Sequence, residues 1–269
     1  MVDTLSRVSG SRSSQRPLGS RGWAVIVGGA LLPVLLVAAW QVTTALGVFT
    51  VAQLPSPTMV WEAAVDLFDR GLLTLDVAIS TQRVLIGFVI GAVLGLGVGA
   101  LVGLSRVSDI LLAPTIGALR AVPSLAWIPL LLLWLKIGEE SKITLIAIGA
   151  FFPVYTTVTG ALRHVDRQLV EAGRAFGLRG VRLFATVQLP AVIPSVISGL
   201  RLALAQAWLF LVAAELLGAS MGLGFLLSDS GTNGRLDRIL LAIIMLAVLG
   251  KLSDALIGVF EKWATRRWS

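Results

Sequence analysis

The chain has 269 residues, of which 56% are hydrophobic and 14% are charged, and its mean hydropathy is +0.89. A soluble domain of this length does not bury so much apolar surface, so the composition predicts a membrane protein. The lack of cysteine excludes disulfides and thiolate metal sites, and a single histidine, His164, leaves no basis for a histidine-based metal cluster.

The net charge of +7 and the sequence pI of about 11.0 need a separate explanation. Basic loops of membrane proteins stay in the cytoplasm and face anionic lipid, so we interpret the excess as topological. Nucleic-acid binding would require basic residues gathered on one soluble face, which is not the pattern here. Membrane lipid, and no nucleic acid, is therefore the expected partner of this charge.

Six apolar segments are long enough to cross a bilayer as helices, at about 20 residues per crossing. Residues 1–21 precede them and are rich in Ser, Gly and Arg, which predicts a disordered cytoplasmic tail. Residues 22–269 are expected to form a single transmembrane domain, whose first segment is retained as a span and not cleaved as a signal peptide. The predicted spans cover residues 22–46, 77–104, 111–135, 141–162, 190–217 and 237–260.

The charged residues between these segments set the expected orientation. Basic residues exceed acidic ones in the tail, in the loop 163–188 and at the C-terminal end, whereas the stretch 62–76 is acidic. The positive-inside rule therefore puts both termini and the loop 163–188 in the cytoplasm. Residues 55–70, which begin with Pro55 and Pro57, are too short and too charged to span. Their apolar positions recur at helical spacing, which predicts an external amphipathic helix lying on the membrane.

Five glycines in the second predicted span lie four residues apart. Glycines at this spacing form a groove along one helix face and let another helix backbone approach closely. The pattern fits either a tightly packed helix at the centre of a moving bundle or ordinary membrane helix packing. No domain-scale repeat is evident, which disfavours a secondary transporter built from repeated halves. The glycines are Gly87, Gly91, Gly95, Gly99 and Gly103.

Several arginines lie within the predicted spans, where an ionisable side chain is costly, and three of them are candidates for binding an anion. Arg83, Arg120 and Arg201 can each attract an anion through charge-assisted hydrogen bonds, or else form an internal salt bridge or reach the headgroups. Arg120 precedes Val122 and Pro123, where we expect the helix to break. A break at membrane depth is tolerated only beside protein or a water-filled cavity, which makes Arg120 a candidate for a translocation path.

The fifth predicted span adds candidates for that path or its gate. Glu215 lies late in the span, and because a lone acid is an odd ligand for an anion, we expect a structural or gating ion pair. Gln206 and Trp208 can face a central path, although aromatic residues in membrane helices are more often packing residues. The turn 222–224 that follows either offers backbone N–H groups to an anion or is a plain re-entrant turn.

The loop between the fourth and fifth predicted spans is longer than a simple connection needs. It contains EAGRAFGLRGVRLFATVQLP, residues 171–190, in which Asp166 can cap a helix that Gly177 ends. A second short helix is expected at about 180–187, and Pro190 can open the fifth span. The pattern predicts a compact helix–turn–helix that projects from the membrane.

Small residues in this loop suit contact with a partner protein. Ala172 and Gly173 would let a partner surface come close, and Phe176 can fill a socket on that surface. The alternative is an interfacial helix that rests on lipid headgroups and is held there by its arginines.

The same loop resembles the EAA loop of bacterial ABC importer permeases. Glu171, Ala172, Gly177, Leu189 and Pro190 match the pattern, and Gly173 stands where the family usually has a second alanine. The resemblance implies an all-α type I importer permease fold, in which this loop is the coupling helix that docks on a separate ATP-binding subunit. The implied coupling residues are Glu171, Ala172, Gly173, Phe176, Gly177, Leu189 and Pro190.

Further stretches, such as LPSPTMVWEA and LRAVPSLAWIPLLLLWLKIGEESKI, look like the permeases of aliphatic sulfonate, taurine and nitrate uptake systems, and the likeness is greatest to the sulfonate permease. The resemblance implies a bacterial inner-membrane permease homodimer with two ATP-binding subunits and an extracytoplasmic substrate-binding protein. The chain has no GxxxxGK[ST] loop, because Gly250-Lys251 is followed by Leu252, so ATP and Mg are expected on the partner ATPase.

We therefore expect a transport subunit, not an enzyme, for a small organic anion such as an aliphatic sulfonate. Permeases for nitrate, taurine or vitamin precursors are alternatives within the family. A stand-alone channel or secondary transporter is an alternative of another class. It would transport without an ATPase and without need of the loop 163–188.

Overall fold

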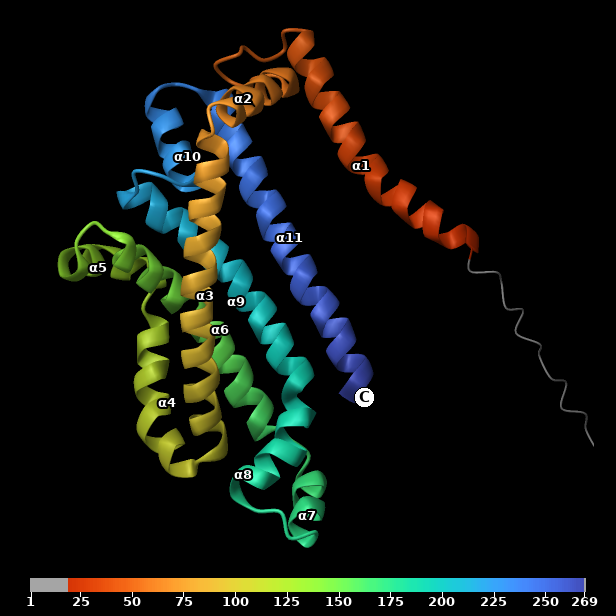
Figure 1. The fold of residues 1–269 in the computed structure, drawn as a ribbon, viewed down its shortest axis with the longest axis vertical. Helices are drawn as coiled ribbons and strands as arrows, with labels where there is room; N and C mark the ends of the chain where they lie inside the picture. Colours follow the sequence, from red (N-terminus) through yellow and green to blue (C-terminus); the bar gives the residue numbers. More distant parts are fainter. Residues whose placement is uncertain (1–18, 269) are drawn as a thin grey trace, which may run out of the picture. The chain divides into compact units, whose positions relative to one another are not determined.

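The computed structural model describes the backbone of residues 19–268 and the side-chain surroundings of residues 31–262. Within these ranges every regular element is helical, as predicted (Figure 1). The chain separates into two compact units, residues 1–57 and 58–269, which are described each by itself. The predicted tail, 1–21, lies outside the described residues except for its last three, with which the first helix begins.

The elements are named in chain order. They are α1 (Gly19–Ala45), α2 (Pro57–Asp69), α3 (Leu72–Leu104), α4 (Arg106–Ala121), η1 (Ser124–Trp127), α5 (Ile128–Leu135), α6 (Glu139–Arg163), α7 (Arg167–Ala175), α8 (Gly180–Leu183), the π-helical turn η2 (Phe184–Gln188), α9 (Leu189–Gly218), α10 (Leu223–Thr232) and α11 (Leu236–Trp268).

The first unit consists of α1 and the segment that follows it. The part of α1 with described side chains, Leu31–Ala45, is apolar. Near its end, the indole Nε1 of Trp40 donates a hydrogen bond to the carbonyl oxygen of Pro55 at 3.0 Å. The chain therefore folds back on the end of α1 before α2 begins.

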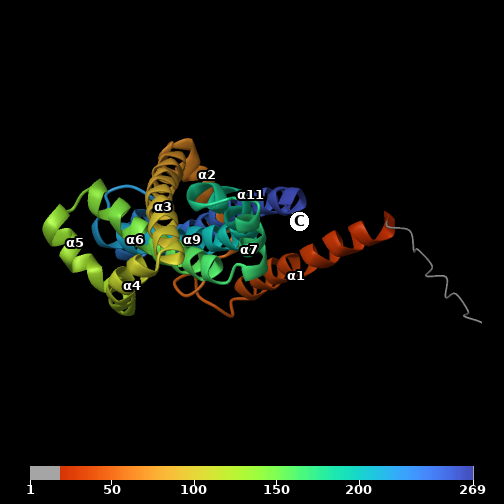
Figure 2. The ribbon, with the colours of Figure 1, turned by 90° about the horizontal axis from the view of Figure 1, so that it is seen from below.

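The core of the second unit is the contact between α3 and α6, which the five glycines of α3 make possible. A Cβ atom at Gly87 would lie 2.6 Å from the side chain of Ile146, and one at Gly103 would lie 2.9 Å from Leu162. These two contacts are sixteen residues apart on α3 and sixteen residues apart on α6, in the same order along the chain. The two helices therefore run parallel (Figures 1 and 2). The chain between α3 and α6 must therefore run back toward the end of the unit at which α3 begins.

That return is made by a helix that is broken within the predicted span 111–135, before Pro123, where the sequence predicts a break. The axis turns by 89° between Arg106–Ala121 and Ser124–Leu135. Pro123 has no backbone N–H, and proline disfavours helical dihedrals in the preceding residue. Val122 is accordingly extended, with φ −70° and ψ 126°.

The other predicted spans of this unit correspond to unbroken helices. Four helical stretches are long and apolar enough to cross a membrane: Leu72–Leu104, Glu139–Arg163, Gly180–Gly218 and Leu236–Lys262. The bent pair brings this number to five among the described residues. The predicted total of six is not confirmed as a number, because α1 adds only the shorter apolar stretch Leu31–Ala45 in its described part.

The predicted second short helix at 180–187 is not a separate element. It continues into α9 through the π-helical turn, in which the N–H of Leu189 bonds to the carbonyl oxygen of Phe184, five residues earlier. Pro190 explains the wider turn, because its ring would clash with the carbonyl four residues before it in a regular α-helix. The loop is therefore joined to α9 without a flexible link.

Elements at opposite ends of the second unit differ in character (Figure 1). The α7–α8 hairpin lies at one end, and α2 and α10 lie at the other. The sequence predicts that the apolar face of α2 lies on the membrane. In the structure, Val60, Ala63 and Leu67 of α2 are buried in the protein instead. Asp66 on the same helix pairs with Arg238 of α11 at 3.3 Å.

The α3–α6 contact makes a direct prediction about stability. In Gly91→Ala, the added methyl would overlap the carbonyl oxygen of Ala147, which is backbone and cannot move aside cheaply. We expect a loss of about 1–3 kcal/mol, the usual cost of overpacking, seen as a lower unfolding temperature in detergent. Gly97→Ala is the matched control on the same helix, because nothing lies within 4 Å of its added methyl. Equal unfolding temperatures for the two variants would contradict the close contact.

Candidate functional site

The helical hairpin α7–α8 has well-defined ends. The Asp166 carboxylate caps α7 by accepting a hydrogen bond from the backbone N–H of Gln168 at 2.8 Å. At the other end Gly177 has a left-handed φ of +79°, its N–H bonds to Arg174, and the N–H of Leu178 bonds to Gly173. This is the hydrogen-bond pattern of a Schellman cap. The helix start and stop therefore lie where the sequence predicts them.

Gly173 holds the hairpin closed and does not face a partner, contrary to the expectation for this residue. A Cβ there would lie 2.7 Å from Leu183 and 3.0 Å from Val187, so α7 packs tightly against α8 and η2. Ala172, the neighbouring small residue, is exposed, as is Glu171, which pairs with Arg167 at 2.8 Å. Of the two small residues, Ala172 alone is open to a partner.

Large apolar side chains project from this hairpin, and we call Leu169, Phe176 and Val181 the loop-tip surface. Phe176 is 87% exposed and Val181 is 82% exposed, and Leu169 is half exposed. The sequence analysis identified Phe176 but not Val181. The position of Val181 between Arg179 and Arg182 could have indicated that its side chain is exposed. Leu189 is exposed and Pro190 half-buried where α9 begins.

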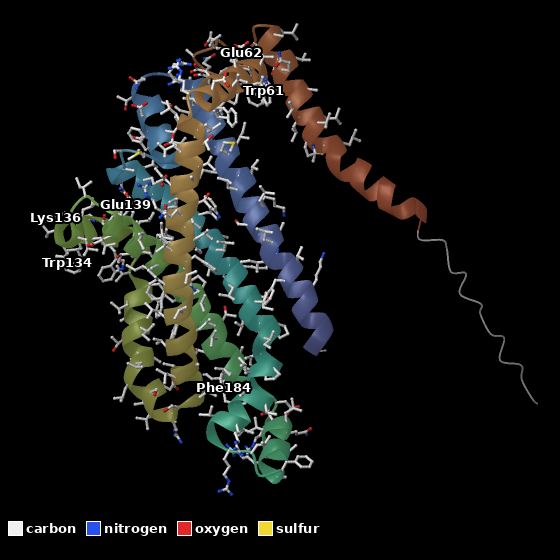
Figure 3. All side chains as sticks on the ribbon, viewed as in Figure 1. Trp61, Glu62, Trp134, Lys136, Glu139 and Phe184 are labelled. Carbon is white, nitrogen blue, oxygen red and sulfur yellow. The ribbon has the colours of Figure 1, made fainter. Side chains whose placement is uncertain are left out.

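A second feature lies toward the other end, where Arg83 of α3 contacts α6, α9 and the turn before α10. Its guanidinium makes a two-pronged ion pair with Glu139 of α6, with both nitrogen–oxygen distances 2.6 Å. It also donates to Glu215 of α9 at 2.7 Å and to the carbonyl oxygen of Met221 at 2.7 Å. Figure 3 shows Glu139 at the start of α6, next to α5.

The same cluster holds the start of α10. The backbone N–H groups of residues 222, 223 and 224 donate to Asp76, Ser80 and Glu215 respectively, at 2.8, 2.9 and 2.8 Å. These donors are therefore taken by the protein itself, and the idea that this turn offers them to an anion is not supported. We call Asp76, Ser80, Arg83, Glu139 and Glu215 the Arg83 cluster.

The Arg83 cluster explains why an acid is placed late in α9. Glu215 is 1% exposed and Arg83 is 3% exposed, so each would carry a large desolvation cost alone. With Ser80 donating to Glu215 and three helices contributing partners, the pair is satisfied. Glu215 thus lies in an ion pair, the arrangement expected for it, and not free in an open path.

The two other candidates on α9 differ in their surroundings. Trp208 is buried in the core and donates its indole N–H to Ser253 of α11 at 2.9 Å, which favours a packing role. Gln206 is half-buried and has no hydrogen-bond partner among the described residues. Arg201 is held by two acids of α11, Asp254 at 2.9 Å and Glu261 at 2.8 Å.

Arg120 has no partner in the part of the chain that the structure describes. It lies on the last turn of α4, is exposed, and makes no ion pair or hydrogen bond with any residue that the structure describes. It lines a groove between α4 and α6 together with Tyr155, Thr156 and Arg163. No cluster of possible metal ligands occurs among the described residues.

The fold and these features define a helical, multi-span membrane protein with a projecting loop that exposes apolar side chains. The family model described as Binding-protein-dependent transport system inner membrane component matches residues 87–266. The chain therefore belongs to this family, whose members are transport subunits located in the inner membrane.

Two curated relatives have similar length. The putative aliphatic sulfonates transport permease protein SsuC of Bacillus subtilis (strain 168) is 40% identical over 90% of this chain and 86% of its own. The protein of the same name from Escherichia coli (strain K12) is 42% identical over 92% and 94%. Among solved structures, an inward-facing form of the MetNI methionine ABC transporter has a TM-score of 0.57 and covers 80% of this chain and 99% of its own, at 23% identity, which supports the fold alone.

The Arg83 cluster predicts a strong asymmetry between ion pairs. Glu215→Gln should destabilise the protein by about 3–5 kcal/mol, because it removes one of the two carboxylates that pair with the buried Arg83 guanidinium. Arg70→Gln removes an exposed pair with Asp66 and should cost at most about 1 kcal/mol. Unfolding of both variants in detergent, followed by tryptophan fluorescence, measures the difference. A Glu215→Gln variant as stable as Arg70→Gln would show that the cluster does not hold the helices together.

Proposed function

We propose that this chain is the transmembrane subunit of an ATP-driven importer of aliphatic sulfonates. The observation that carries the proposal is its 40% and 42% identity to two permeases named for aliphatic sulfonates, over 90% and 92% of this chain. The chain would form the path through the membrane. A separate pair of subunits would bind and hydrolyse ATP with Mg, and an extracytoplasmic protein would deliver the sulfonate.

The α7–α8 hairpin is proposed as the contact with the ATP-binding subunit. Its support is the loop-tip surface, since Phe176 and Val181 are exposed apolar side chains on a hairpin that lies at one end of the unit. The exposed Ala172 lets a partner approach. The helix that begins at Gly180 continues unbroken to Gly218, so a displacement of the hairpin would move α9 directly.

The assembly proposed is a dimer of this chain with two ATP-binding subunits. The hairpin and both termini would lie in the cytoplasm, and α2 and α10 would face the outside. The support is the charge bias of the loops, together with the placement of the hairpin and α2 at opposite ends of the unit.

The docking role predicts that two small changes disrupt the complex. Phe176→Ala removes the most exposed ring of the loop-tip surface, and Ala172→Glu adds a charge where a partner should come close. Each should lower copurification of the ATP-binding subunit and sulfonate uptake by tenfold or more, as for loss of an interface anchor worth about 2 kcal/mol.

The matched control is Trp61→Ala, which truncates an aromatic ring that is 71% exposed on α2 at the opposite end (Figure 3). It should leave copurification of the ATP-binding subunit unchanged. Normal copurification and normal uptake in both hairpin variants would rule out the docking role.

The proposed orientation can be tested by cysteine labelling, because the natural chain has no cysteine and gives no background. We expect Val181→Cys to react with a membrane-impermeant maleimide only from the cytoplasmic side of sealed vesicles. Glu62→Cys, on the exposed side of α2, should react only from the other side (Figure 3). Labelling of both positions from the same side would refute the proposed topology.

A further inference from the structure

The three arginines considered as anion ligands differ in their surroundings in the structure. Arg83 and Arg201 are each held by two carboxylates. Arg120 is exposed and has no partner among the described residues. An unpaired guanidinium facing lipid is costly, so a position such as this calls for water or an anion in front of it.

Arg120 also lies deep in the second unit. Near the start of α4, Asp109 pairs with Arg163. Arg120 lies eleven residues after Asp109, which is roughly 16 Å along the helix. The break at Val122 comes two residues after Arg120. Interrupted backbone at membrane depth is tolerated where it lines a cavity or contacts protein, so the helix break points to the same conclusion as the unpaired charge.

The groove beside Arg120 has a volume of about 280 Å³ and lies between α4 and α6. Two hydroxyl groups in it are already used, since Thr156 donates to the carbonyl of Phe152 and Thr159 to that of Gly99. The Tyr155 hydroxyl donates to none of the described residues. Arg163 also lines the groove but is paired with Asp109, so the donors left for a ligand are the Arg120 guanidinium and this phenol, which suit the oxygens of an anionic group.

An apolar cavity of about 410 Å³ lies one helical turn away along α6. On α6, Phe151 and Phe152 line the cavity, and Tyr155 and Thr156, one turn later, line the groove. On α4, Leu119 lines the cavity and the next residue, Arg120, lines the groove. The lining is apolar except for Thr144. The cavity walls are completed by Ile90, Leu94, Trp127, Leu131, Trp134, Ile143, Ala147 and Ile148.

We propose that the groove and the cavity form one two-part site for an aliphatic oxyanion on its way through the membrane. Arg120 and Tyr155 bind the sulfonate group, and the cavity takes the alkyl chain. This inference rests on the proposed function and deepens it. It also separates the substrate classes of such importers, because nitrate has no alkyl chain to fill the cavity.

The first test is binding to the permease–ATPase complex in lipid nanodiscs, without the extracytoplasmic protein. Hexane-1-sulfonate should change tryptophan fluorescence, since Trp127 and Trp134 line the cavity, and methanesulfonate and nitrate should bind at least tenfold more weakly. Arg120→Gln should weaken hexane-1-sulfonate binding at least tenfold, with Arg120→Lys less affected. Arg106→Gln is the control, an exposed arginine on the same helix outside the groove.

The second test is uptake into proteoliposomes by the complete importer, expressed per ATP hydrolysed. Arg120→Gln should lower this ratio about tenfold, while Leu119→Trp, which fills the cavity, should lower it for hexane-1-sulfonate and spare methanesulfonate. Both variants keep the same binding protein as the wild type, so its selectivity cancels in the comparison.

The two tests separate the failure of each proposal. Wild-type behaviour of Arg120→Gln in both tests overturns the two-part site, as does an equal effect of Leu119→Trp on short and long sulfonates. Should Arg120→Gln not assemble, Leu119→Trp and Arg120→Lys decide the question. Sulfonate binding by a wild-type complex that shows no ATP-driven uptake would overturn the proposed function and leave the site standing.

Discussion

The close contact between α3 and α6 is the constraint on which the second unit depends. Glycines four residues apart remove every side chain from one face of α3, and residues 146–162 of α6 fill the space. In lipid there is little hydrophobic gain from bringing helices together, so close packing must hold them. Because the two helices are parallel, the chain between them has to return, and the broken α4–α5 segment, with its groove and cavity, is the consequence.

The treatment of charge follows the same logic. Arg83, Glu139 and Glu215 join three helices and secure the start of α10, while Arg201 joins α9 to α11 through two acids. Each of these charges has its partners within the protein. Arg120, beside a break in the helix, has no such partner among the residues described, and this contrast, more than the presence of an arginine, directs attention to the groove.

The two ends of the second unit complement each other. At the hairpin end, caps at Asp166 and Gly177 define α7, and the hairpin exposes Phe176 and Val181. At the other end, the Arg83 cluster fixes the starts of α6 and α10 and the end of α9. Since α9 reaches from the hairpin through the unit to Glu215, it links the proposed docking surface to the cluster.

Local patterns in the sequence were sufficient for the helical membrane class, the glycine face, the cap at Asp166 and the turn at Gly177, because each depends on residues near in the chain. They also indicated the break before Pro123. The partner of Glu215, the inward face of Gly173 and the isolation of Arg120 depend on residues from other helices. Only the tertiary structure decided these, since an ionisable side chain in a span is paired or free according to what the packing brings beside it.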